Sequence, residues 1–292
     1  MAFGQTAATA PLFEDSLLPG EVRREFAFSD ADFKFLSQLA YEHSGIVLSE
    51  AKRNLAYGRL SRRLRLLKLN SFKEYREYLA GHEQEIQNFI NSISTNHTKL
   101  FREAHHFEHF RAHVVKPIVQ SSQSRRVRIW SAGCSSGEEP YTIAAVIARD
   151  ISHIARHDIR MLATDIDTDI LTKAARGEFS ASAVEDVPHE YESFFPRGAN
   201  EQTVQVSDKL RSMIAFRQLN LLGPWPFKGQ FDAIFCRNVM IYFDTQTKAA
   251  LVDRFTKQLR PGGWLYIGHS ESLYGAHPGL KLMGRTIYRR DV

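Results

Sequence analysis

The sequence of 292 residues lacks the usual features of a membrane, secreted or metal-binding protein. No apolar stretch approaches the roughly 18 residues that span a bilayer. The chain does not open with a basic segment and an apolar core, the pattern of a secretory signal. The two cysteines, Cys134 and Cys236, are far apart and lack the spacing of a zinc site. These absences favour a protein of the reducing cytoplasm that holds no metal.

What the sequence does contain is typical of a globular protein with two domains. Hydrophobic residues make up 43% and charged residues 24% of the chain. Residues 1–20, rich in Ala, Thr and Pro, predict a flexible leader. The formal net charge is +5. Residues 1–128 hold 19 basic and 14 acidic residues and the remainder holds 19 of each, so we expect an acidic partner to dock on the first part.

Residues 21–94 have the apolar periodicity of an all-α domain. Ser29, Ser49 and Ser71 each precede an amphipathic segment that they can cap, and a fourth helical segment spans 85–93. The helix predicted at 52–68 is strongly basic. Its cationic arc holds Lys52, Arg59, Arg62 and Arg63, and its apolar arc holds Tyr57, Leu60, Leu64 and Leu67.

The cationic arc of the 52–68 helix has two interpretations. It can be a solvated helix face or a docking surface for an acidic partner. Glu50 is the only acidic residue between Glu42 and Glu74, so local ion pairs do not account for the clustering. We therefore favour the docking surface.

After Arg128 the predicted strands alternate with predicted helices. We expect strands at 127–131, 159–164, 214–218, 231–236, 264–268 and 285–289, and helices at 139–151, 167–176 and 246–259. This alternation predicts an α/β fold with a doubly wound, mostly parallel sheet and helices on both faces. Residues 181–217 do not fit the alternation and predict a small inserted subdomain.

The segment from Ile129 to Tyr141 is the most informative part of the chain. A short apolar strand leads into a loop of Gly, Ser and Cys, and a helix then begins at Glu138. Such a loop brings backbone N–H groups close to a ligand. However, Gly133 and Gly137 do not fit the spacing G-x-G-x-x-G, and a tight turn without a ligand would have the same pattern. Cys134 suits small-residue filler better than a nucleophile.

Polar residues follow two further strands. Asp165 ends the second strand, where a carboxylate can accept hydrogen bonds from ribose hydroxyls, whereas Asp167 suits the cap of the next helix. Arg237, Asn238 and Tyr242 follow the strand at 231–236 and are expected in the crevice beyond the carboxyl ends of the strands. Because no second phosphate-binding loop is found, a methyl donor carrying a nucleoside is favoured over a dinucleotide.

Taken together, these segments resemble the chemotaxis receptor glutamate methyltransferases of the CheR type, which use S-adenosylmethionine. The resemblance covers about residues 25 to 290. It is carried by Asn96–Glu103, Gly137–Tyr141, Ala163–Asp167, Asn220–Leu222, Phe231–Asp244 and Gly268–Glu271.

The resemblance implies a Rossmann-like methyltransferase domain (127–292) with a small β-subdomain inserted at about 181–217. An all-α receptor-docking domain (21–94) precedes it, followed by a linker helix (95–126) that contributes to the cofactor site. For the cofactor it implies Asn96, Thr98 and Arg102 from the linker, Glu138 at the methionine end, Asp165 at the ribose, and Asn220, Leu221, Arg237 and Asn238 on the adenine side. The choice between Glu138 and Glu139 is open, and we take Glu138. Arg102 and Tyr242 would border the transferred methyl group.

The chemistry of such a reaction agrees with these residues. A glutamate side chain, with an ordinary pKa near 4.3, is already a carboxylate at neutral pH, so attack on a sulfonium methyl needs no general base. The protein must align the two groups and remove water. Arg102 can hold the acceptor carboxylate and Tyr242 can orient it, although a salt bridge of Arg102 with Glu103 or Glu138 and a packed Tyr242 are the simpler alternatives.

One departure and two alternatives complete the prediction. The loop at 197–203 is two or three residues shorter than in relatives that dock a receptor's C-terminal peptide, so we expect no need for that tether. A non-catalytic module that senses S-adenosylmethionine is the main alternative. A nucleic-acid methyltransferase is disfavoured, because the basic helix lacks interleaved aromatic residues that could stack on bases. We expect a monomer that does not insert into membranes.

Overall fold

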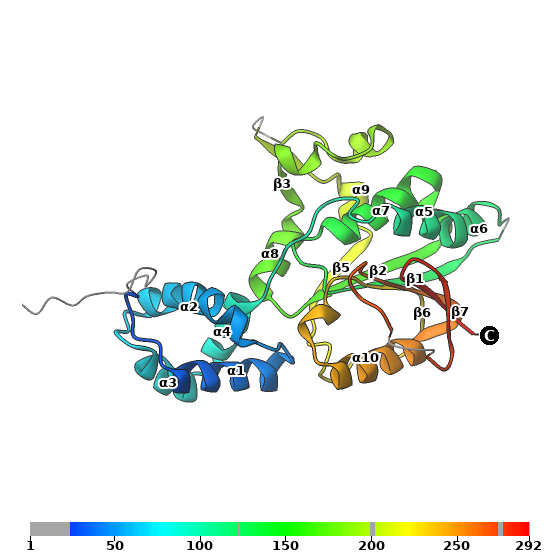
Figure 1. Ribbon diagram of the computed structural model, residues 1–292. Coiled ribbons are helices and arrows are strands. Elements are labelled where there is room, and N and C mark those ends of the chain that lie inside the picture. The colour runs from blue at the N-terminus through cyan, green and yellow to red at the C-terminus, as the bar shows by residue number, and fades with distance from the viewer. Residues whose placement is uncertain (1–23, 122, 199–201, 274–276, 292) are drawn as a thin grey trace, which may run out of the picture.

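In the computed structural model, which describes residues 24–121, 123–198, 202–273 and 277–291, the predicted N-terminal helices are present. They are α1 (Asp30–Ser44), α2 (Arg53–Leu67), α3 (Phe72–Gly81) and α4 (Glu83–Ile93), with a short 3₁₀ turn, η1 (Glu50–Lys52), before α2. The expected leader at 1–20 lies outside the described residues. These helices form a separate bundle beside the larger α/β part of the chain (Figure 1).

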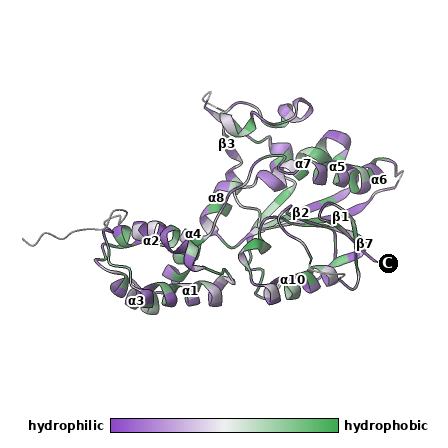
Figure 2. Ribbon diagram, in the orientation of Figure 1, coloured by the Kyte–Doolittle hydropathy of each residue, from purple (hydrophilic) through white to green (hydrophobic). Residues whose placement is uncertain are grey.

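Local sequence signals explain where these helices begin. The Ser29 side chain accepts a hydrogen bond from the Asp32 amide, and Asp32 returns one to the Ser29 amide, which is a complete capping box. Ser71 caps α3, since its side chain likewise accepts a hydrogen bond from the Glu74 amide. Helices in the bundle show mixed apolar and polar residues along their length (Figure 2). Their apolar sides meet in a core that includes Leu60, Leu64, Phe72, Tyr75 and Phe89, all fully buried.

The linker between the two parts is helical only in its second half. Residues 94–104 are irregular. A helical run follows, made of α5 (His105–Phe110), the π-helical turn η2 (Arg111–Val115) and α6 (Lys116–Val119). The first part of the predicted linker helix at 95–126 is therefore an irregular, turn-rich crossing rather than a helix.

The main sheet has seven strands in the order β5-β2-β1-β6-β7-β9-β8 within the described residues. Their bounds are β1 (Arg126–Ala132), β2 (Asp158–Asp165), β5 (Ile214–Gln218), β6 (Phe231–Cys236), β7 (Leu259–Ile267), β8 (Leu280–Gly284) and β9 (Ile287–Arg290). β5, β2, β1, β6 and β7 are parallel, and β9 and β8 complete the sheet as antiparallel neighbours. The predicted α/β fold with a mostly parallel sheet is confirmed, and β8 is an additional strand.

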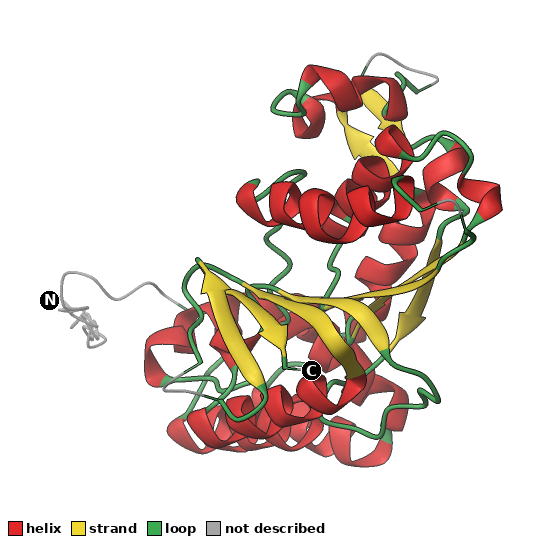
Figure 3. Cartoon of the chain, turned by 90° about the vertical axis from the view of Figure 1, so that its right-hand side faces the viewer, coloured by secondary structure: helices red, strands yellow, loops and turns green. Residues whose placement is uncertain are grey.

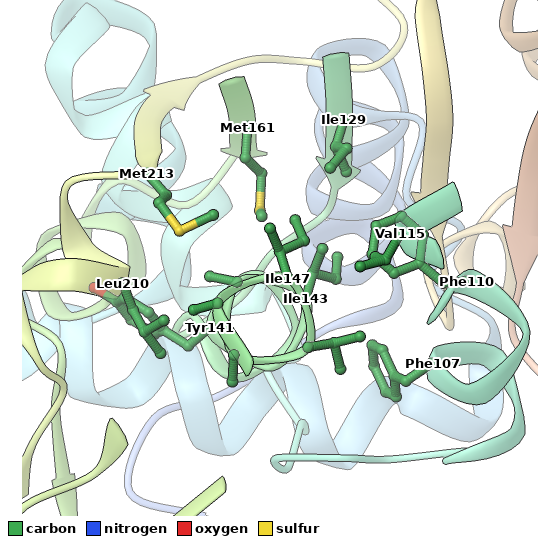
Figure 4. Packing of buried hydrophobic residues seen from close by; sticks show 14 of the residues in the cluster. Phe107, Phe110, Val115, Ile129, Tyr141, Ile143, Ile147, Met161, Leu210 and Met213 are labelled. Atoms are coloured by element: carbon green, nitrogen blue, oxygen red, sulfur yellow. The ribbon is translucent and has the colours of Figure 1, made fainter. Parts of the chain in front are cut away.

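Helices cover both faces of this sheet, as Figure 3 shows. Besides the linker helix, they include α7 (Glu138–Asp150), α8 (Thr168–Arg176), α9 (Asp208–Arg211) and α10 (Thr245–Gln258). On one face α7 and the linker helix pack on alternate strand residues (Figure 4). On the other face Leu251, Val252 and Phe255 of α10 pack against Trp130 and Ile234. The order of the strands reverses between β1 and β6, and such a switch point is where open α/β sheets bind ligands.

The segment between α8 and β5 forms the small second sheet. Its strands β3 (Glu178–Ser180) and β4 (Thr203–Gln205) pair antiparallel, with the 3₁₀ turns η4 (Ala181–Val184) and η5 (His189–Phe194) between them. The main sheet resumes at Ile214, so the last residues of the predicted insertion at 181–217 belong to β5. Across the described residues, no helix combines the length and apolar character that crossing a membrane requires.

Candidate active site

A cavity of about 1160 Å³, counting its open mouth, lies at the carboxyl ends of β1, β2 and β6. Three parts of the chain line it. The helical domain contributes Ser44, Ile46, Leu48, Lys52, Leu55, Ile93 and Ser94, the linker contributes residues 95–98 and Arg102, and the sheet domain contributes the loops after its strands. The cavity therefore exists only where the two domains and the linker meet.

The loop after β1 forms one wall of this cavity through tight backbone turns. Gly133 has a φ of 87°, and a Cβ there would lie 2.3 Å from Cγ2 of Val239. The Gly133 and Cys134 amides donate to the carbonyl oxygen of Thr164, which fixes the loop to the end of β2. The Cys134 thiol is buried and burial raises its pKa, so the thiolate is disfavoured, which agrees with a packing role. The Ser135 hydroxyl is buried without a partner beside the cavity.

Asp167 and Asp165 have separate roles. Asp167 caps the next helix, as the sequence predicts, and Asp165 lines the cavity. The Asp167 carboxylate caps α8 by accepting from the amides of Asp169 and Ile170. Asp165 lines the cavity, and its carboxylate accepts from the Ser135 amide at 2.8 Å and the Asp167 amide at 3.0 Å. Burial raises the pKa of Asp165, and these two amides act against that rise. The capping role of Asp167 is confirmed.

Glu139, and not Glu138, faces the cavity, which corrects the choice made from the sequence. Glu139 accepts hydrogen bonds from the Ser131 hydroxyl at 2.8 Å and from Arg237 at 3.0 Å. Glu138 instead accepts from the Ser136 hydroxyl at 2.7 Å and is not among the lining residues. Successive helix residues point about 100° apart, so only one of two neighbours at the start of α7 can face the strand ends. Burial raises the pKa of Glu139.

Arg237 is a buried bridge between carboxylates. One Nη lies 3.0 Å from Glu139, and the other lies 3.4 Å from Glu103 and donates to the Arg102 carbonyl oxygen. Its side chain is only 3% exposed. The Arg237 guanidinium therefore joins the linker to the start of α7. Arg237 also lines the cavity, so its place on the adenine side stays a prediction.

The linker residues reach the cavity as predicted from the resemblance. Asn96, Thr98 and Arg102 all line it. The Asn96 amide donates to Asp167 at 2.7 Å, which ties the linker to the end of β2. The Arg102 guanidinium donates to the His97 carbonyl at 2.9 Å and lies 4.0 Å from Glu103. Both contacts of the Arg102 guanidinium are with residues of the linker, so the linker itself holds this side chain at the cavity.

The remaining predicted residues form the opposite wall, next to the helical domain. Asn220, Leu221, Asn238 and Tyr242 all line the cavity. The Asn220 side chain donates to the His43 carbonyl at 2.8 Å, so its amide nitrogen holds the helical domain. The Tyr242 carbonyl accepts from the Val47 amide at 2.9 Å, and the Lys52 ammonium lies 5.1 Å from the Tyr242 ring.

The lining contributed by the helical domain was missed from the sequence. Ile46, Leu48, Lys52 and Leu55 have no local pattern that distinguishes them from core or surface residues. Only the docking of the two domains places them in the cavity. Lys52, which the sequence analysis assigns to a docking surface, also lines the cavity. In the parts of the chain that the structure describes, no group of three or more His, Cys, Asp or Glu side chains could hold a metal ion.

Two residues of the predicted cationic arc, Arg59 and Arg63, are used inside the helical domain, and receptor docking on the rest of the arc stays a prediction. Arg59 donates to the carbonyl oxygens of Ile93 and Ser94, and Arg63 forms an ion pair with Glu85. Glu85 comes from α4, so the scarcity of acids near Arg63 in the sequence was misleading. Arg53 and Arg65 likewise pair with Asp30 and Glu25. Arg62 remains exposed beside the exposed apolar side chains of Leu55 and Leu66.

Comparison with known proteins gives consistent matches along the chain. Residues 31–94 match the family model described as CheR methyltransferase, all-alpha domain, and residues 96–289 match CheR methyltransferase, SAM binding domain. A probable chemotaxis protein methyltransferase of Rhizobium etli is 43% identical over 86% of this chain and 96% of its own length. Chemotaxis protein methyltransferase 2 of Pseudomonas aeruginosa is 41% identical over 91% and 95%. The chemotaxis protein methyltransferase of Escherichia coli is 41% identical over 96% and 98%.

Proposed function

Because the chain belongs to the CheR methyltransferase family, we propose that it methylates glutamate side chains of chemoreceptors with S-adenosylmethionine. The product at each site is a glutamate methyl ester. One observation supports this most directly: the cavity at the strand ends combines buried carboxylates on the sheet side with Arg102 from the linker and Tyr242. The substrate helices are cytoplasmic, so the protein works in the cytoplasm. We propose separately that it acts as a monomer.

The donor set of the cavity fits a cationic nucleoside. Glu139 suits the methionine ammonium and Asp165 suits the ribose hydroxyls, since carboxylates only accept hydrogen bonds at neutral pH. The unpartnered Ser135 hydroxyl offers a further polar contact. Asn96 and Thr98 close the cavity from the linker, and Asn220, Leu221 and Asn238 lie on the adenine side. Arg237 supports this arrangement by fixing Glu139.

When bound, S-adenosylmethionine supplies a methyl group on a positively charged sulfur. The acceptor carboxylate is ionised at neutral pH and needs no base. Arg102 binds that carboxylate through N–H groups that the His97 carbonyl leaves free, and the Tyr242 hydroxyl orients it. The domain interface keeps water away from the reacting groups. Alignment and desolvation thus provide the rate acceleration.

We place the receptor-docking surface on the end of η1 and the exposed side of α2. It consists of Lys52, Leu55, Arg62 and Leu66. Leu55 is 48% and Leu66 is 68% exposed, and Lys52 and Leu55 also line the cavity. Apolar side chains flanking a cation suit an amphipathic acidic helix. Affinity for such a partner falls as salt concentration rises.

We also propose that this protein does not require a peptide at the receptor's C-terminus. The basis is the short loop at 197–203, of which residues 199–201 lie outside the described residues. The neighbouring strands β3 and β4 are short, with three residues each. Calorimetric titration with a receptor-tail peptide tests this point, and tight binding would overturn it.

The experiment that tests the proposed function uses S-adenosylmethionine labelled in its methyl group. Incubation with a receptor cytoplasmic fragment should place label on the fragment and release it as methanol in base. A fragment with glutamines in place of its acidic methylation sites serves as the matched control and should stay unlabelled. Cofactor binding without transfer to any receptor fragment would instead support a non-catalytic sensor. Label on nucleic acid would support a nucleic-acid methyltransferase.

A further inference from the structure

The segment Gly268–Glu271 follows β7 and contributes to the resemblance, but its Glu271 has no role in the site described above. Glu271 is 5% exposed and does not line the cofactor cavity. Its carboxylate accepts three backbone hydrogen bonds. Oε2 accepts from the Gly268 amide at 2.6 Å and from the Asn238 amide at 2.9 Å, and Oε1 accepts from the Ile241 amide at 3.2 Å.

This arrangement compensates the burial of the carboxylate. An isolated buried carboxylate is strongly unfavourable, whereas hydrogen bonds from several amides stabilise the charged form. Burial raises the pKa of Glu271, and the bonds from Gly268, Asn238 and Ile241 act against that rise. None of the three bonds belongs to a strand ladder or a helix. Where the chain leaves β6, the Glu271 carboxylate therefore serves as the hydrogen-bond acceptor for amides that have no backbone partner in a strand or helix.

Two of the three amides belong to the loop that carries site residues. Asn238 has a φ of 59°, in the left-handed region that asparagine adopts more often than other residues with a side chain, and the bond from its amide to Glu271 helps to hold it there. Ile241 lies in the 3₁₀ turn η6 (Met240–Tyr242), which ends at Tyr242. One carboxylate thus fixes both ends of the segment that presents Asn238 and Tyr242 to the cavity.

The third contact shows how closely the two loops approach. A Cβ on Gly268 would lie 2.7 Å from the Asn238 backbone nitrogen and 2.3 Å from its Nδ2. No side chain larger than hydrogen fits there without moving Asn238. The loop after β7 therefore acts as a template against which the loop after β6 is held.

We propose that Glu271 is a positioning residue for methyl transfer, acting through the backbone of residues 238–241 on Asn238 and Tyr242. The inference rests on the proposed function, since it assigns Asn238 to the cofactor and Tyr242 to the acceptor. Glu271 touches neither. Its loss shifts both side chains, so cofactor affinity and turnover fall together while the rest of the sheet stays folded.

The test compares Glu271→Gln with Asp232→Asn in the full-length protein. Asp232 is a matched control because it is also buried, lies at the opposite end of β6, and accepts a backbone hydrogen bond from the Arg128 amide at 2.7 Å. Glu271→Gln turns an acceptor oxygen into an NH₂ group that faces an amide donor. It should lower kcat by about 100-fold, as expected for a misplaced reacting group. It should also weaken binding of S-adenosylhomocysteine by about tenfold, a change that calorimetry resolves.

Asp232→Asn should lower the stability and leave both quantities within about threefold of the original. If Glu271→Gln changes kcat and cofactor affinity no more than Asp232→Asn does, Glu271 is only structural and the proposal is wrong. Should Glu271→Gln fail to fold, Gly268→Ala decides, because its Cβ displaces Asn238 while the carboxylate stays intact. It should show the same joint loss, and unchanged kinetics would overturn the proposal. Absence of methyl transfer by the unmodified protein would contradict the proposed function instead.

Discussion

The guanidinium of Arg59 on α2 donates a hydrogen bond at 2.7 Å to the carbonyl oxygen of Ile93, the last residue of α4. The same nitrogen lies 2.9 Å from the Ser94 carbonyl oxygen. Carbonyls at a helix C-terminus have no partner within the helix, so Arg59 acts as their cap and joins α4 to α2 at the start of the linker. Burial lowers the pKa of Arg59, which agrees with its position inside the domain.

Replacing Arg59 by Ala should therefore destabilise the protein. Leaving these carbonyls unpaired costs about 1–3 kcal/mol of unfolding free energy. Urea denaturation followed by circular dichroism measures the change. Arg62→Ala is the matched control on the same helix, and as an exposed side chain it should change stability by less than about 0.5 kcal/mol. Equal stability of the two variants would contradict the capping role.

Arg62 should instead act in receptor docking. Arg62→Glu reverses a charge on the exposed side of α2 without removing an internal bond. We expect a higher KM for the receptor fragment, by about tenfold at low salt, and an unchanged dissociation constant for the cofactor. Lys116→Glu provides the control, because Lys116 is exposed on α6, in a part of the chain that does not line the cavity. An Arg62→Glu enzyme with the receptor KM of the control would remove α2 from the docking surface.

Glu139 and Glu138 give a direct test of the cofactor site. Glu139→Gln keeps the size of the side chain and an acceptor for Ser131, but it removes the charge that faces the cavity and pairs with Arg237. Affinity for S-adenosylhomocysteine, which retains the ammonium group, should fall by roughly 10- to 150-fold, since a charged hydrogen bond is worth about 1.5–3 kcal/mol. Glu138→Gln should leave affinity nearly unchanged. Calorimetry distinguishes the two, and the reverse order would restore Glu138 as the contact.

These two neighbours also show where prediction from the sequence stops. The small-residue loop, the strand before it and the helix after it follow from local patterns, and so does the cap at Asp167. Which of two adjacent glutamates faces the cavity depends on the rotation of α7 about its axis. That rotation is set by packing against the sheet, to which residues distant in sequence contribute.

The charge of α2 gives the second lesson. Its cations were interpreted as unpaired because acids are scarce within one helical turn of them. Glu85 pairs with Arg63 from 22 positions away, so the rule for local pairs had no bearing on it. Sequence patterns identified both domains and most lining residues after the strands. They could not identify lining residues such as Leu48, which reach the cavity only when the domains dock.

His106 predicts how stability depends on pH. It is fully buried between the linker helix and the sheet, and burial, followed by the nearby Arg237 charge, lowers its pKa to about 3. In the unfolded chain a histidine has a pKa near 6.5. The unfolded state therefore binds more protons between these values, so the contribution of His106 is complete above about pH 6.5 and is lost as the pH falls toward 3.

Urea denaturation at several pH values between 5 and 7 checks this prediction. His106→Gln should show a shallower fall in unfolding free energy than the original protein, by at most about 1.4 kcal/mol per pH unit. Comparing the two slopes removes the contributions of other groups that titrate in this range, including His109, whose pKa burial lowers to about 4. Parallel slopes would mean that His106 does not titrate on unfolding.

Arg102 and Tyr242 should affect turnover more than binding. Arg102→Lys keeps a positive charge but loses the planar group that can hold a carboxylate through two N–H bonds. We expect kcat to fall by about 100-fold, because a misaligned acceptor rarely reaches the methyl group in line. Tyr242→Phe removes one orienting hydroxyl, which corresponds to about tenfold in kcat. Affinity for S-adenosylhomocysteine should change much less in both variants, since the acceptor carboxylate is absent from that complex.

Tyr41→Phe is the control for Tyr242→Phe. The Tyr41 hydroxyl donates to Asp244 at 2.8 Å near the domain interface, but Tyr41 does not line the cofactor cavity. Its loss should leave kcat within about twofold of the original. If Tyr41→Phe lowers kcat as much as Tyr242→Phe does, the effect comes from the docking of the two domains and not from orientation of the acceptor. A tenfold difference between two hydroxyls at the same interface would instead support orientation of the acceptor by Tyr242.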